Sequence, residues 1–338
     1  MAVLDVFRNK AFSVMSLTDA VNKRPFVPGR LGELGLFEES GIKSLRVVIE
    51  RKNGRLTLVP ASNRGGPAHQ KATNRRDAIE LKTIHLSVED RIPADEIQDV
   101  RSFGQEAQVK TMQEELMERF DETFSDFDAT QEHLRIGAIK GKVLDADGTT
   151  ELVDLFDAFG ITAPTAIDFD LDNASPGADA VRKKASQVIR TIEDALGMAS
   201  YTSIHGFCSS TFFDDLVGHP QVKEAYERFN AGQALRDQTA RRSLFYAGIM
   251  FEEYRGKVNG VDFIPEGDAR FVPLGVPRLF RNVFSPADFV ETVNTRGLPR
   301  YAKVAPDDRF QRYLDTHVQS NPLPYCTRPE VLLRGTRT

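Results

Sequence analysis

The sequence is poor in the residues that metal sites, disulfide frameworks and membrane spans require. Its 338 residues include no tryptophan, six histidines and two cysteines. Cys208 and Cys326 match no metal-ligand spacing and are too few for a disulfide framework, so we expect two buried thiols. No apolar run approaches the ~18 residues that cross a bilayer, and no charged-then-apolar leader opens the chain. We therefore expect a protein that stays in the cytosol and makes no membrane contact.

Neither sign of charge is in large excess. Lysine and arginine total 44 against 49 aspartates and glutamates, a formal net charge of −5. A general nucleic-acid binder would normally be basic, so this balance argues against one. The hydrophobic content of 41% and charged content of 28% are ordinary for a globular protein, and the length suggests two domains or one elaborated domain.

The most enzyme-like stretch contains His205 and Cys208, because a thiol beside an imidazole can act as a nucleophile. Residues three apart on a strand face opposite sides, however, and no third orienting group is apparent. Ser209 and Ser210 are better explained as caps of a helix that begins near Thr211. A cysteine hydrolase is therefore the weaker alternative.

Two further patterns resemble ligand sites without matching them. Asp168, Asp170 and Asp172 alternate along a predicted strand, but the glycine and terminal glutamate of a calcium loop are absent. The glycines of residues 65–67 are not followed by the Lys-Ser/Thr of a phosphate loop. The sequence thus predicts a protein that is not an enzyme, with no catalytic residue, metal or cofactor.

One long amphipathic helix is predicted from Asp95 to about His133. Apolar residues recur along it at steps of three or four, the spacing of one helical face: Val109, Met112, Leu116, Phe120, Phe124, Phe127 and Leu134. Between Asp95 and Asp128 the other face carries eleven acidic against three basic residues, a net of −8. Such a helix is expected to serve as a spine on which other parts lie.

The segment before this helix predicts a projecting hairpin with a basic tip. Residues 45–50 are rich in β-branched side chains, Asn53-Gly54 is a turn pair, and an apolar strand returns over residues 79–88. Seven basic residues and no acidic one lie between positions 51 and 76: Arg51, Lys52, Arg55, Arg64, Lys71, Arg75 and Arg76. Residues 1–44 have too little periodic apolar surface for a core of their own and are expected to form an extended arm.

The rest of the chain mixes helices and strands that do not alternate strictly, which is typical of an α+β fold. A strand is expected at 138–144, a helix after Ser175-Pro176 and a strand followed by a short helix at 203–216. Residues 245–251 and 258–265 are expected to form a hairpin with each other. The helix after Pro176 has a regular apolar face: Val181, Ala185, Val188, Ile192 and Leu196.

An arm without a core, a basic loop and an acidic helix together indicate self-association, because each would find its partner on another copy. We expect the loop of one copy to cover the helix of its neighbour. The predicted intersubunit contacts are Arg51, Arg55, Arg64, Lys71, Arg75 and Arg76 on the loop, with Glu114, Glu118, Asp121 and Glu122 on the helix.

This order of parts resembles the major capsid proteins of tailed bacteriophages with the Hong Kong 97-type fold, and most closely the lambda-type capsid protein E family. The resemblance covers essentially the whole chain. It is carried by these stretches: 58–67 (LVPASNRGGP), 92–97 (IPADEI), 251–256 (FEEYRG), 284–303 (FSPADFVETVNTRGLPRYAK), 319–324 (QSNPLP) and 328–329 (RP).

The resemblance implies four parts: an N-terminal arm (1–44), an extended loop (45–91), a peripheral domain with the spine helix (92–175) and a mainly axial domain (176–338). C-terminal strands are expected to complete the peripheral domain, with the tail returning to it. The implied function is a structural protein of the virion. It would be assembled in the host cytoplasm into hexamers and pentamers of an icosahedral shell, as a procapsid that later expands.

The partners implied by the resemblance are further copies of the chain, a scaffolding protein, a portal and a head decoration protein. The shell would enclose double-stranded DNA without sequence-specific binding. An encapsulin, a shell of the same fold that houses an enzyme, is the alternative within this fold.

Overall fold

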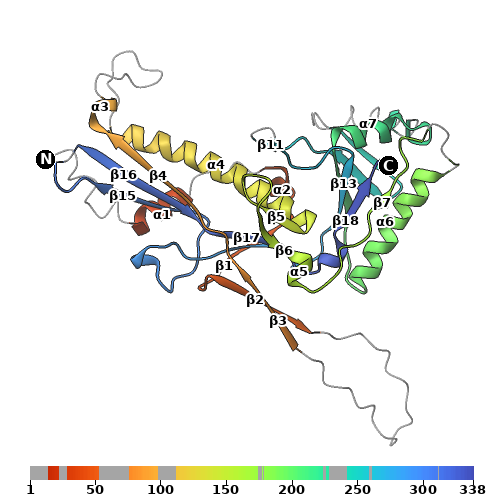
Figure 1. Cartoon of the computed structure of the whole chain (residues 1–338), viewed down its shortest axis with the longest axis horizontal. Coiled ribbons are helices and arrows are strands. Elements are labelled where there is room, and N and C mark those ends of the chain that lie inside the picture. The colour runs from red at the N-terminus through yellow and green to blue at the C-terminus, as the bar shows by residue number, and fades with distance from the viewer. Residues whose placement is uncertain are drawn as a thin grey trace, which may run out of the picture.

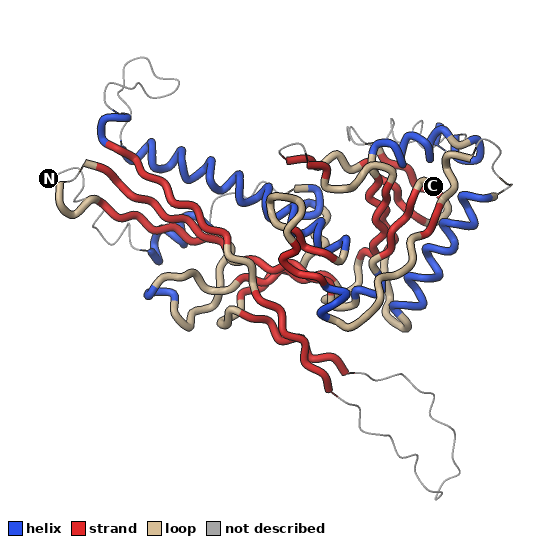
Figure 2. The backbone as a smooth tube through the Cα atoms, in the orientation of Figure 1, coloured by secondary structure: helices blue, strands red, loops and turns tan. Residues whose placement is uncertain are grey.

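The computed structural model describes residues 14–22, 29–52, 76–97, 112–173, 177, 179–223, 226–227, 242–258, 261–310 and 312–338. These residues form an elongated molecule with a sheet and helices at each end and a hairpin that projects from its middle (Figures 1 and 2). Helices and strands are segregated, so the predicted α+β class is confirmed. Within the described residues, no helix combines the length and the apolar character that a membrane span requires.

One end of the molecule is a three-stranded antiparallel sheet covered by the long helix (Figure 1). The strands, in sheet order, are β15 (Tyr301–Pro306), β16 (Tyr313–Ser320) and β4 (Leu86–Pro93). The helices are α1 (Val14–Asn22), α3 (Ala94–Ile97) and α4 (Met112–Lys140). The apolar face of α4 packs here: Leu116, Phe120, Phe124 and Phe127 join Ile92, Leu314 and Val318 in one buried cluster. The 3–4 spacing therefore predicted the buried side of α4 correctly.

The other end is a six-stranded sheet with two helices against it. Its strands, in order, are β7 (Ile167–Asp168), β18 (Leu333–Thr336), β13 (Asp268–Leu274), β8 (Ser203–Cys208), β10 (Ile249–Glu253) and β9 (Ser243–Tyr246). The helices are α6 (Ala180–Leu196) and α7 (Ser210–Gly218). Phe169 stacks on Phe271 with ring centroids 5.6 Å apart, at the centre of an aromatic core. All five predicted apolar residues of α6 are buried, which confirms that helix and its face.

Smaller elements connect the two ends. A three-stranded sheet contains β1 (Glu38–Gly41), β14 (Phe280–Phe284) and β17 (Pro322–Cys326), and β1 runs parallel to β14. Two short hairpins are β5 (Lys142–Leu144) with β6 (Glu151–Asp154), and β11 (Lys257–Val258) with β12 (Val261–Asp262). The remaining helices are α2 (Arg30–Glu33), α5 (Leu155–Ala158), and the 3-10 turns η3 (Val290–Thr292) and η4 (Pro329–Val331).

The projecting hairpin consists of β2 (Arg46–Lys52) and β3 (Arg76–Lys82), paired antiparallel along their whole length (Figure 1). The prediction that the returning strand runs from 79 to 88 was wrong, because β3 and β4 are separate strands in different sheets. The Thr83 amide donates to the Leu45 carbonyl and closes the hairpin. The Ile84 amide then donates to the Pro322 carbonyl, which directs the chain toward the next sheet.

Helix α4 continues to Lys140, beyond the predicted end near His133, and the predicted strand at 138–144 begins only at Lys142. Gly137 did not end the helix; it lets β5 approach, since a Cβ there would lie 2.8 Å from the Val143 Cα. The helix ends at Gly141, whose φ is +83°. The predicted part of the helix between residues 98 and 111 lies outside the described residues.

The predicted hairpin between residues 245–251 and 258–265 was also wrong. Ala247 and Gly248 have φ values of +48° and +88° and form a tight turn inside the first run, which joins β9 to β10. Strand β10 then pairs in parallel with β8, a partner more than 40 residues earlier in the chain. Residues 257–262 form their own short hairpin, β11–β12.

Candidate intersubunit surfaces

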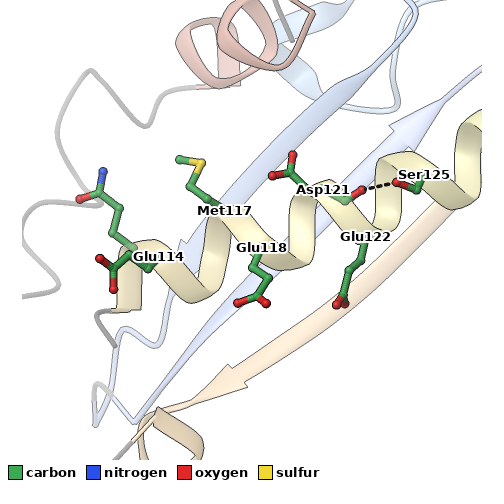
Figure 3. A pocket seen from close by; sticks show the side chains of 7 residues that line it. Glu114, Met117, Glu118, Asp121, Glu122 and Ser125 are labelled. Carbon is green, nitrogen blue, oxygen red and sulfur yellow. Dashed lines mark hydrogen bonds between the residues drawn. The ribbon is translucent and has the colours of Figure 1, made fainter. Parts of the chain in front are cut away.

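The outer face of α4 is the strongly acidic surface that the sequence predicted. Glu114, Glu118, Asp121 and Glu122 are all exposed, opposite the apolar face. Figure 3 shows Glu118 and Glu122 on one side of the helix and Met117 and Asp121 on the other. Together with Gln113 and Ser125 these residues line a surface groove of about 810 Å³. The structure thus places the four predicted helix residues on one continuous surface.

Other acidic residues of the spine region are paired within the chain. The Arg119 guanidinium contacts three carboxylates: Glu96 on α3 at 2.7 Å, Glu115 at 2.7 Å and Asp90 on β4 at 2.8 Å. Hydrogen bonds to Glu115 and Asp90 raise the pKa of Arg119. This cluster fastens α3 and β4 to α4, a role that sequence reasoning missed because its members lie up to 29 residues apart.

The basic half of the prediction is only partly placed by the structure. Arg51 lies in β2 opposite Asp77, and Arg76 lies in β3 opposite Lys52. Arg55, Arg64, Lys71 and Arg75 lie outside the described residues. The described part of the hairpin, β2 and β3, points away from α4 (Figure 1).

The root of the hairpin is anchored, but its outer surface is not covered by the described chain. Val47 and Leu81 are buried against the main core. Leu45 and Val48, by contrast, are 62% and 61% exposed. In the described residues β2 and β3 pair only with each other. A two-stranded ribbon is at best marginally stable by itself in water, so this geometry suits a hairpin that lies on another surface.

A buried polar cluster fixes the chain that leads from the arm into the body. Arg30 donates two hydrogen bonds of 2.6 Å to Glu252 on β10, and His205 Nε2 lies 3.1 Å from the same carboxylate. Burial alone would raise the pKa of Glu252, but the hydrogen bonds from His205 and Arg30 outweigh it and hold the pKa at about 2. The Leu31 amide donates to Glu132 of α4 at 2.8 Å, so the same short segment also contacts the spine.

The residues that could have formed a nucleophilic site are arranged differently. His205 contacts Glu252, whereas the buried Cys208 thiol donates weakly to the Gly206 carbonyl at 3.6 Å. Burial raises the pKa of Cys208 well above its usual value, which disfavours the thiolate. Ser209 Oγ accepts a hydrogen bond from the Phe212 amide, so the capping role predicted for Ser209 is confirmed.

The predicted aspartate row does not form a metal site in the described part of the chain, which contains no group of three or more potential metal ligands. Asp168 accepts a hydrogen bond from the Asp170 amide at 2.8 Å, and Asp170 has a φ of +53°. These two residues therefore form a turn at the end of β7.

Comparison with known proteins gives one consistent family. The model of the family described as phage major capsid protein E matches residues 13–337. The major capsid protein of Salmonella phage Felix O1 is 27% identical to this chain, and the alignment covers 95% of both proteins. That of Pseudomonas phage KPP10 is 25% identical over 96% of both chains.

The fold agrees with this family. The capsid of cyanophage Pam1 superposes with a TM-score of 0.51 over 92% of both chains at 10% sequence identity. Since the family model covers nearly every residue, the chain belongs to the phage major capsid protein E family and has the Hong Kong 97-type fold of phage capsid proteins.

Proposed function

We propose that this chain assembles with copies of itself into hexamers and pentamers of an icosahedral phage head that encloses double-stranded DNA. Membership of the capsid protein E family supports a structural role in the virion. The observation that carries self-assembly is the β2–β3 hairpin, a ribbon with exposed Leu45 and Val48 and no covering strand in the described chain. A neighbouring copy would supply the missing cover.

The charges suggest where the hairpin of one copy lies on the next. The tip between residues 51 and 76 carries seven positive charges, and the outer face of α4 carries Glu114, Glu118, Asp121 and Glu122. Because the hairpin points away from α4 of its own chain, the pairing would join two copies (Figure 1). Complementary charges of this kind guide the correct register more than they add affinity.

The four-part division is part of the proposal. The arm would be residues 1–44, the extended loop 45–91, the peripheral domain 92–175 and the axial domain mainly 176–338. The packing of β15 and β16 with α4 in one buried cluster supports completion of the peripheral domain by C-terminal strands. During expansion of the procapsid the arm and loop would pivot while the two sheet regions move as units.

The proposed partners besides DNA are a scaffolding protein, a portal and a head decoration protein, with assembly in the host cytoplasm. An encapsulin is the alternative within the fold, and the match to phage capsid relatives favours the phage head. The proposal includes no catalytic step. Hydrolysis by the purified chain that is lost in Cys208→Ala, with particle yield unchanged, would contradict this part.

Electron microscopy of the purified chain, expressed alone and with its genomic neighbours, tests assembly directly. The sharper test reverses charges. Arg64→Glu/Arg75→Glu/Arg76→Glu should abolish closed particles while leaving subunit folding intact, because the loop would then repel α4 of the neighbour. Combining it with Glu114→Lys/Glu118→Lys/Glu122→Lys should restore particles.

A matched control is Lys43→Glu/Lys223→Glu/Arg278→Glu, which changes net charge equally at exposed positions on other surfaces. This control should assemble normally. Normal shells from the loop variant, or failure of the control to the same degree, would contradict the loop–helix pairing. Wild-type subunits that stay monomeric under every condition would contradict shell formation itself.

A further inference from the structure

Helix α6 has an exposed face with a concentrated positive charge. It contains Arg182, Lys183, Lys184 and Arg190, the first three of them within its first five residues. Arg182, Lys183 and Arg190 are exposed and Lys184 is half-buried, while the opposite face of the helix fills the core. The helix lies along the outer border of the six-stranded sheet region, at the end of the molecule farther from α1 and α3 (Figure 1).

These charges do not serve the stability of the helix. The first turn of α6 contains no acidic residue and the last turn no basic residue. Arg182 and Lys183 therefore lie at the positive end of the helix dipole, and the acidic Glu193 and Asp194 lie toward its negative end. Both placements are unfavourable for the helix.

The positive charges are not held in ion pairs by the described chain, although Asp179 is the N-cap residue of the helix and the exposed Glu193 and Asp194 lie near its end. None of the four basic side chains of α6 forms an ion pair with a described residue. Arg242 and Arg334, near the same sheet, do form ion pairs, with Asp214 and Asp268. The four basic residues of α6 outnumber its two acidic ones, and a net positive helix on a chain of net charge −5 indicates an anionic partner outside the chain.

The composition of the face favours a phosphate backbone over a protein surface. Ser186 and Gln187 lie between the charged residues, and no exposed large apolar side chain lies on α6. A protein interface usually has an apolar centre, whereas interfaces with nucleic acid are polar and positive. From Arg182 to Arg190 the helix advances about 12 Å, which is close to the width of ~12 Å of the major groove of B-DNA.

We propose that this face of α6, defined by Arg182, Lys183, Lys184 and Arg190, binds the phosphate backbone of duplex DNA without base specificity. The inference rests on the proposed function, because it concerns the DNA that the shell would enclose. About three to four phosphate contacts make the binding weak and strongly salt-dependent. A weak contact of this kind holds DNA near the wall while leaving it free to move.

Fluorescence anisotropy of a labelled duplex of about 30 base pairs, titrated with the full-length chain at several salt concentrations, tests the inference. Arg182→Gln/Lys183→Gln/Lys184→Gln/Arg190→Gln should lower the affinity for DNA at least about tenfold at low salt. The slope of the logarithm of the binding constant against the logarithm of the salt concentration should become smaller in magnitude by about 3. Arg182→Lys/Arg190→Lys should keep the wild-type slope, because phosphate contacts need charge rather than a particular cation.

The matched control is Lys43→Gln/Lys82→Gln/Lys223→Gln/Arg278→Gln, which removes the same charge from four scattered exposed positions. It should change affinity less than about threefold. Equal losses in the two quadruple variants would show an effect of net charge alone and overturn the inference. Absence of DNA binding by the wild-type chain would overturn it as well.

Particle formation of the same variants, followed by electron microscopy, separates this inference from the proposed function. The α6 variant should form particles like wild type. Lost particles with unchanged DNA affinity would show that the face contacts another copy, which overturns the inference. If the wild-type chain forms no particles, the proposed function is contradicted. If the wild-type chain forms particles but the α6 variant binds DNA as tightly as wild type, only this inference is contradicted.

Discussion

At the scale of single residues, the best-defined anchor in this chain is the carboxylate of Glu252. It accepts two hydrogen bonds from Arg30 and one from His205, and it is almost fully buried. Breaking such a buried pair leaves an uncompensated charge, which is usually strongly destabilising. The cluster therefore holds the C-terminal part of the proposed arm, around Arg30, against β10.

The pKa of Glu252 predicts how the stability of the subunit depends on pH. Its value of about 2 lies below the ordinary value of 4.5, so the carboxylate stabilises the folded state above about pH 4.5. This contribution, on the order of 3 kcal/mol, is lost as the pH falls from about 4.5 toward 2. Glu252→Gln should lower the free energy of unfolding near pH 7 by a similar amount. It should also make this free energy depend less on pH below pH 5.

Denaturant unfolding of unassembled subunits between pH 7 and pH 3 measures this dependence. The control is Glu266→Gln, an exposed acid in the turn before β13, which should leave both the free energy and its pH dependence unchanged. If the free energy of unfolding of Glu252→Gln falls with pH below pH 5 as steeply as that of wild type, the pH dependence does not come from Glu252.

No sequence signal marked Glu252, although it lies inside a stretch, 251–256, that resembles the family. The sequence offered only Cys208 as a neighbour for His205 and argued against that pair, whereas the structure places His205 beside a carboxylate 47 residues later. Arg30 is 222 residues from the same carboxylate. Contacts across sheets depend on tertiary pairing, which spacing along the chain does not reveal.

At the scale of elements, the sequence predicted helix faces well and strand partners poorly. The buried faces of α4 and α6 follow from a 3.6-residue period that is local to each segment. The partner of a strand is not local. Residues 245–251 were paired with the wrong segment because the Ala247–Gly248 turn divides them, and because β10 takes β8 as its second neighbour.

Gly137 shows how one close contact can require glycine inside a helix. A Cβ at this position would lie 2.8 Å from the Val143 Cα and 2.9 Å from the Lys142 carbonyl oxygen, both backbone atoms that cannot easily move. Gly137→Ala should therefore lower the free energy of unfolding by about 1–3 kcal/mol, although alanine favours helices. Thermal or denaturant unfolding of the subunit measures the change.

Gly218, the last residue of α7, is the matched control, because nothing lies within 4 Å of a Cβ built on it. Gly218→Ala should leave the stability unchanged or raise it by up to about 1 kcal/mol. If both alanine variants are equally stable, the close approach of β5 to α4 does not require glycine at position 137.

At the scale of the whole molecule, the sequence indicated which surfaces carry charge but not how they are used within one chain. The acidic face of α4 was predicted as a unit, yet Glu96 and Glu115 are tied to Arg119 and Asp128 pairs with the buried Arg300. Counting charges along the helix could not identify these internal pairs, because Asp128 and Arg300 are 172 residues apart in the sequence. Only the fold brings them together.

The hairpin gives the prediction that depends on assembly as a whole. In the single chain β2 and β3 form a ribbon with exposed Leu45 and Val48, so its amides should exchange with solvent readily in free subunits. In assembled particles a neighbouring copy would cover the ribbon and slow exchange by at least about tenfold. Hydrogen–deuterium exchange of subunits and particles, read by mass spectrometry, measures this directly.

The six-stranded sheet supplies an internal control, since β8 lies between two neighbouring strands in the single chain and its backbone is paired before any assembly. Its exchange should differ little between subunits and particles. Equal slowing of β8 and of the hairpin would indicate a general stabilisation by the shell instead of local cover. Unchanged exchange in β2–β3 would mean that the hairpin stays open in the shell, and the exposed Val48 would then need a partner other than a second copy of this chain.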